Sequence, residues 1–108
     1  MPSFNLYKHT PESYYIEGEL TFASINKKTV PSFDFLTKSK EICIDLKKVT
    51  TADSAGLALI LEWLKYSKQH NTKLIFKNLP QQLLVLGTLS GLDLTEYLAD
   101  DTPNLRLD

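Results

Sequence analysis

The sequence predicts a single α/β domain in which a mixed central β-sheet has helices packed on it. The length of 108 residues suits one hydrophobic core. The apolar share of 43% and the charged share of 23% are ordinary for a globular protein. Extended apolar segments alternate with amphipathic ones in the order strand, strand, helix, strand, helix, strand, helix, helix. Strands that alternate with helices indicate crossover connections within one sheet.

The N-terminal part of the chain predicts two strands and a helix. Phe4–Tyr7 alternates weakly and is predicted as an edge strand. Tyr14–Leu20 is rich in aromatic and β-branched residues, which favours a second strand. Thr29 is a candidate N-cap and Pro31 suits a first helical turn, so we expect a helix that runs through Phe33–Leu36 and has Lys38 and Lys40 near its C-terminus.

The C-terminal part predicts two further strands and three helices. In Glu41–Leu46 apolar residues follow one another without alternation, which predicts a strand buried on both faces and followed by a polar loop. The other expected elements are a helix over Ser54–Gln69, a strand over Lys73–Lys77, a helix with Pro80 in its first turn and Gly91 at its stop, and a short helix within Leu92–Leu98. We expect residues 1–99 to form the domain and the acidic residues 100–108 to be a loosely ordered tail.

Composition excludes several kinds of partner. Twelve basic and thirteen acidic residues give a net charge of -1, and no Lys/Arg run exceeds a pair, so nucleic-acid binding has no electrostatic support. No apolar run approaches the roughly 20 residues of a membrane span, and the N-terminus does not resemble a signal peptide. The single cysteine, Cys43, agrees with a reducing compartment. We therefore expect a cytoplasmic protein without direct membrane insertion.

Catalytic patterns are absent from the sequence. There is no phosphate-binding G-x-x-x-x-G-K-[ST] loop and no G-x-G-x-x-G motif. His9 and His70 lack a second ligand at metal spacing, so neither a metal nor a cofactor is expected. Cys43 stands between two isoleucines and is predicted to be a buried, unreactive thiol. These observations predict that the protein is not an enzyme.

The predicted helix over Ser54–Gln69 carries two apolar stripes. One stripe has the spacing of a core face and contains Leu57, Ile60, Leu61 and Leu64. The other contains Leu59, Trp63 and Tyr66 and points away from the centre of the first. The second stripe has two interpretations: it closes the edge of the core against a neighbouring helix, or it is a binding surface anchored by aromatic side chains.

The start of the same helix contains Asp53, Ser54, Ala55 and Gly56. Ser54 or Asp53 suits the N-cap, a role worth about 1 kcal/mol. Gly56 costs a helix up to about 1 kcal/mol relative to alanine. Small residues here allow another backbone to approach closely, or leave the Ser54 hydroxyl open to a phosphate donor or a partner. The residues alone leave capping, phosphorylation and partner contact as alternatives.

Two segments resemble the signature of STAS domains in residue type and spacing. They are Asp45-Leu46-Lys47-Lys48-Val49 and Asp53-Ser54-Ala55-Gly56-Leu57. STAS domains include anti-sigma-factor antagonists and the cytoplasmic domains of sulfate transporters. Within that family the chain is most similar to MlaB-type subunits of phospholipid-transport ABC complexes. That likeness rests on Gly18–Ala23, Gly56–Leu64, Asn78–Leu83 and Leu89–Leu92. The resemblance implies a STAS fold over nearly the whole chain.

The resemblance also implies a function. An MlaB-type protein would be a non-catalytic cytoplasmic subunit that binds and regulates or stabilises the ATPase of an ABC complex maintaining outer-membrane lipid asymmetry. It would meet the permease only indirectly and lie peripheral to the inner membrane through its partner. The partner-binding residues expected on this basis are Thr51, Asp53, Ser54, Ala55, Leu57 and Trp63. The alternative is an anti-sigma-factor antagonist switched by phosphorylation of Ser54.

Overall fold

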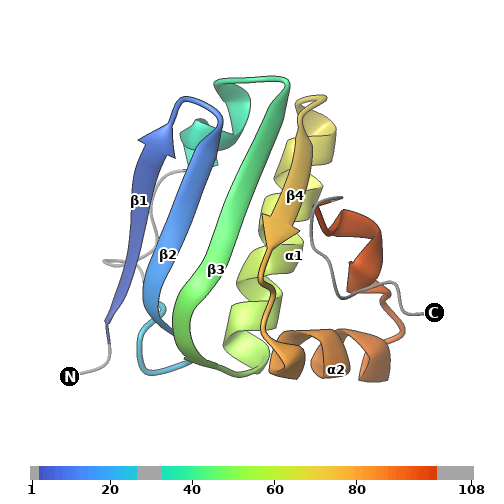
Figure 1. Cartoon of the computed structure of the whole chain (residues 1–108). Helices are drawn as coiled ribbons and strands as arrows, with labels where there is room; N and C mark the ends of the chain where they lie inside the picture. Colours follow the sequence, from blue (N-terminus) through green and yellow to red (C-terminus); the bar gives the residue numbers. More distant parts are fainter. Residues whose placement is uncertain (1–2, 27–32, 100–108) are drawn as a thin grey trace.

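The computed structural model describes residues 3–26 and 33–99, so the predicted tail, Thr29 and Pro31 lie outside the described residues. Four strands form one sheet in the order β1-β2-β3-β4 (Figure 1). Strand β1 pairs antiparallel with β2, whereas β3 pairs in parallel with both β2 and β4. The predicted mixed sheet is confirmed. The strand bounds are β1 Phe4–Thr10, β2 Ser13–Leu20, β3 Glu41–Ala52 and β4 Lys73–Lys77.

The helices lie behind the sheet and at one end of it (Figure 1). Helix α1 (Ser54–Gln69) runs behind the sheet, and its predicted bounds are confirmed. Helix α2 (Gln81–Leu89) lies across the end of the sheet that β3 and β4 run towards. Two short 3₁₀ helices, η1 (Phe33–Thr37) and η2 (Leu94–Tyr97), complete the described part of the chain. The predicted order of elements is confirmed.

The sheet has one buried face and one open face. Along β3 the side chains of Ile42, Ile44 and Leu46 are buried, while those of Cys43 and Asp45 between them are only half-buried. The prediction that β3 is buried on both faces is therefore wrong. Buried and half-buried side chains alternate along β3, as in an ordinary strand with one open face. The sequence does not show this alternation, because Cys43 is apolar and a cysteine can occupy either a buried or a partly open position.

Strand β3 is longer than predicted and replaces the expected polar loop. Glu19 pairs with Thr51 and Leu20 with Ala52, so β2 offers partners up to the last residue of β3. Val49, Thr50 and Thr51 are β-branched and fit this extended conformation. The strand therefore delivers the chain directly to the first residue of α1, with only Asp53 between the two elements.

Three helical predictions need correction in detail. The described part of the helix expected to run through Leu36 is the 3₁₀ helix η1 rather than an α-helix. Pro80 is the N-cap residue of α2 and not part of its first turn. The short helix expected within Leu92–Leu98 is likewise a 3₁₀ helix, η2. Gly91 follows the end of α2 with a φ of 81°, the left-handed conformation predicted for its stop.

Candidate functional site

The junction between β3 and α1 is held by Asp53. Its Oδ1 accepts a hydrogen bond from the backbone N–H of Ala55 at 2.8 Å, which caps the helix. Its Oδ2 accepts one from the N–H of Phe22 at 3.1 Å. The Asp53 N–H in turn donates to the Leu20 carbonyl at 3.0 Å. One side chain thus ties the helix start to the turn after β2.

Ser54 is the first residue of α1, and its side chain is exposed. Asp53 provides the cap, so Ser54 is not needed for it. Within residues 3–26 and 33–99 the Ser54 hydroxyl makes no hydrogen bond. At this position it lies where the helix dipole favours a negative charge. Of the three uses considered from sequence, capping is therefore removed, while modification and partner contact remain compatible with the geometry.

Gly56 lets the start of α1 pack against the end of β2. A Cβ atom at Gly56 would lie 2.5 Å from the Leu20 carbonyl oxygen and 2.8 Å from the Leu20 Cβ. The close backbone approach predicted from the small residue Gly56 is therefore present. The backbone that approaches it is that of Leu20 in the same chain. Packing within the chain therefore explains why a glycine stands in the first turn of α1.

The turn after β2 presents an exposed aromatic side chain that the sequence patterns did not single out. Ser24 is buried, and its Oγ accepts the N–H of Thr21 at 3.0 Å while donating to the Glu19 carbonyl at 2.5 Å. Phe22, between them, is 76% exposed. No hydrophobic periodicity could have identified it, because an irregular turn has none.

Helix α2 borders the junction on its other side. The Gln82 Oε1 accepts a hydrogen bond from the Ala52 N–H at 3.3 Å. Val85 and Leu89 on this helix are 45% and 79% exposed, and with Gln81, Leu84 and Thr88 they line a shallow hollow of about 210 Å³. The junction thus lies between the Phe22 turn and α2.

The structure brings four of the predicted site residues together at a surface. Thr51, Asp53 and Ala55 are partly exposed, and Ser54 is exposed. Leu57, by contrast, is only 6% exposed and belongs to the core. Its prediction as a contact residue is wrong, because its side chain faces the sheet rather than the surface.

The prediction of Trp63 as a partner-binding residue is also wrong. Its side chain is fully buried and packs edge-on against Phe35 of η1, with ring centroids 5.7 Å apart and an interplanar angle of 87°. Tyr66 packs in the same manner against Phe33 at 5.4 Å. The second apolar stripe therefore closes the core against a neighbouring helix, as the first of its two interpretations held.

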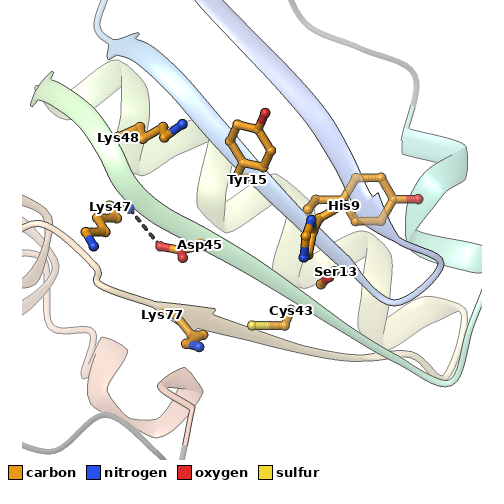
Figure 2. A pocket seen from close by; sticks show the side chains of 9 residues that line it. His9, Ser13, Tyr15, Cys43, Asp45, Lys47, Lys48 and Lys77 are labelled. Atoms are coloured by element: carbon orange, nitrogen blue, oxygen red, sulfur yellow. Dashed lines mark hydrogen bonds between the residues drawn. The ribbon is translucent and has the colours of Figure 1, made fainter.

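A second hollow lies on the open face of the sheet (Figure 2). It has a volume of about 360 Å³, and its lining includes His9, Ser13, Tyr15, Cys43, Asp45, Lys47, Lys48 and Lys77. The Lys48 ammonium lies 5.1 Å from the centre of the Tyr15 ring. Asp45 Oδ1 accepts hydrogen bonds from the Lys47 N–H and the Asn78 side chain. Cys43 borders this hollow, so the prediction of a buried thiol is wrong.

No group of three or more His, Cys, Asp or Glu side chains is placed to hold a metal ion within 3–26 and 33–99. In the same part of the chain, no helix is both long and apolar enough to span a bilayer.

The family model described as "Mlab, STAS domain" matches residues 16–99. The search of curated proteins gave no match. Among solved structures, the anti-sigma factor antagonist SpoIIAA in its unphosphorylated form is similar to this chain with a TM-score of 0.66 at 20% identity, over 93% of this chain and 89% of that one. The Bacillus cell fate determinant SpoIIAA in the phosphorylated form is similar with a TM-score of 0.62 at 19% identity, over 93% and 92%.

Proposed function

Because this chain belongs to the MlaB family of STAS domains, we propose that it is a non-catalytic subunit that binds the ATPase of a phospholipid-transporting ABC complex. The family match over residues 16–99 is the observation that carries the proposal. In such a complex the protein would regulate or stabilise the ATPase, meet the permease indirectly and stay peripheral to the inner membrane on its cytoplasmic side.

The β3–α1 junction is the best candidate for the contact with the ATPase. Thr51, Ser54 and Ala55 offer small, partly exposed side chains on a backbone held by strand pairing and by the Asp53 cap. Asp53 acts as a positioning residue, because both of its oxygens are engaged within the chain. A surface that is already rigid loses little conformational entropy when a partner binds.

A Ser54→Arg variant tests the placement of this contact. Binding to the purified Mla-type ATPase encoded in the same genome is measured by titration calorimetry. We expect the affinity to fall at least about 30-fold, the loss typical of a disrupted interface centre. The matched control is Gln69→Arg, which adds the same charge at the exposed, opposite end of α1 and should leave the affinity unchanged. Full affinity in Ser54→Arg would refute the placement, and no binding by the unmodified protein would refute the function.

A second function is favoured by the exposure of the Ser54 hydroxyl at the first residue of α1. An anti-sigma-factor antagonist switched at this serine would gain a charge of about -1.5 to -2 on phosphorylation. Intact-mass measurement of the protein from its native cells would show the added phosphate, and Ser54→Ala should abolish it. Unmodified protein under conditions that activate the cell's serine kinases would argue against this alternative.

A further inference from the structure

Among the residues that the structure describes, those at one end of the sheet include few with a charge. The stretches Leu20–Asn26, Ser54–Leu61 and Asn78–Leu89 contain no Asp, Glu, Lys or Arg, in a chain that is 23% charged. These stretches are the turn after β2, the first half of α1 and helix α2 with its entry, and Figure 1 shows them gathered at the same end of the sheet. Asp53, which stands among them, has both carboxylate oxygens bonded to backbone N–H groups.

The same end carries most of the exposed apolar side chains in the described part of the chain. Of the four large hydrophobic residues that are exposed there, Phe22, Val85 and Leu89 belong to this end, and the fourth is Tyr7 on β1. Phe22 is the largest of the three, and its turn is fixed by the hydrogen bonds of Ser24 and Asp53. The structure therefore fixes the backbone that carries the exposed phenyl ring of Phe22.

We propose that this uncharged end is one docking surface, with Phe22 as its anchor, and that it receives a neutral, apolar surface of the ATPase subunit with a pocket for the phenyl ring. The inference rests on the proposed function and deepens it. Charged residues are depleted at the centres of protein interfaces, where exposed aromatic side chains often act as anchors; these stretches lack charged residues and carry one such side chain, Phe22. A nucleic acid or an anionic membrane would require cations that these stretches lack.

Hydrogen bonds connect the β3–α1 junction, where Ser54 begins the helix, to both apolar parts of this surface. Phe22 is tied to one side of the β3–α1 junction through Asp53, and α2 is tied to the other through the bond between Gln82 and Ala52. A contact centred on Ser54 would therefore extend to Phe22 on one side and to Val85 on the other.

The test compares the affinities of Phe22→Ala and Tyr7→Ala for the purified Mla-type ATPase. Tyr7→Ala is the control, because it also truncates an exposed aromatic residue but lies on β1. We expect Phe22→Ala to weaken binding at least about 30-fold and Tyr7→Ala to leave it unchanged. Phe22 buries little of its side chain, so thermal unfolding of Phe22→Ala should match that of the unmodified protein. Because the surface is neutral, the affinity should change less than about threefold when sodium chloride is raised from about 0.05 to 0.5 M.

Several results would overturn the inference. Wild-type affinity in Phe22→Ala would overturn it while leaving the proposed function intact, whereas failure of the unmodified protein to bind the ATPase would refute the function itself. Strong salt dependence that Lys47→Glu and Lys77→Glu abolish would assign the contact to the open face of the sheet. If the isolated protein sediments as a dimer and Phe22→Ala as a monomer, the occupant is a second copy of the chain.

Discussion

Replacing Gly56 by alanine should destabilise the protein, although alanine is the better helix former. In an open helical position the change would raise stability by about 1 kcal/mol. Here the new Cβ would lie 2.5 Å from the Leu20 carbonyl oxygen and 2.8 Å from the Leu20 Cβ, both closer than atoms tolerate. Leu20 is fully buried, and its carbonyl accepts the Asp53 N–H, so it has little freedom to move away.

The expected net effect follows from these opposing contributions. Overpacking of a filled core costs about 1–3 kcal/mol, and loss of the bond to Asp53 would add about 1 kcal/mol. After the gain in helix propensity, Gly56→Ala should lower the free energy of unfolding by about 1–3 kcal/mol. For a domain of this size that corresponds to a fall in Tm of roughly 4–15 °C.

Urea unfolding monitored by circular dichroism measures this change. The control is Ala58→Gly, an exposed position in the same helix, which should lose only the propensity term of about 1 kcal/mol. Gly56→Ala could instead raise the free energy of unfolding by about 1 kcal/mol, a gain equal in size to the loss expected for the control. That result would show that the proposed packing of α1 against β2 is wrong.

Three further changes have defined effects on the free energy of unfolding, each measured by the same urea titration. Asp53→Ala removes the cap and the bond to Phe22 and should cost about 2 kcal/mol; a loss no greater than that of Ser54→Ala would contradict the double role of its carboxylate. Trp63→Ala should cost about 3–5 kcal/mol, since the side chain is fully buried, whereas a surface anchor would leave stability unchanged. Ser67→Ala should raise stability by about 1 kcal/mol, because its buried hydroxyl has no hydrogen-bond partner among the described residues and alanine favours the helix; destabilisation would show that the hydroxyl is bonded.

Local signals predicted the position and length of α1 but not the length of β3. Helix α1 has an N-cap aspartate, an apolar periodicity and a polar end, all of which act within the helix itself. The extension of β3 to Ala52 depends on pairing with Glu19 and Leu20, which are about thirty residues away in the chain. A polar, threonine-rich segment becomes a strand when a neighbour supplies its hydrogen bonds, and a sequence window does not contain that neighbour.

The two faces of α1 illustrate the same limit. Periodicity identified two apolar stripes, but it could not show which was covered. The 3₁₀ helix η1 places Phe33 and Phe35 against Tyr66 and Trp63, so the buried face of α1 is wider than its core stripe. For the candidate site, the resemblance to STAS domains predicts Thr51, Asp53, Ser54 and Ala55 as a group. Phe22 joins them only through the pairing of β2 with β3 and a bond to Asp53.

The neutrality of the surface around Ser54 connects the two proposed functions. A phosphate on Ser54 would place about -1.5 to -2 charges within stretches that contain no lysine or arginine to pair with them. The start of α1 tolerates that charge through its dipole, so the fold should survive while the apolar contact is lost. An uncharged surface suits the binding of a neutral partner, and phosphorylation of Ser54 on the same surface would release that partner. The two functions differ in the identity of the partner and in whether a kinase acts on Ser54, rather than in the surface that the protein uses.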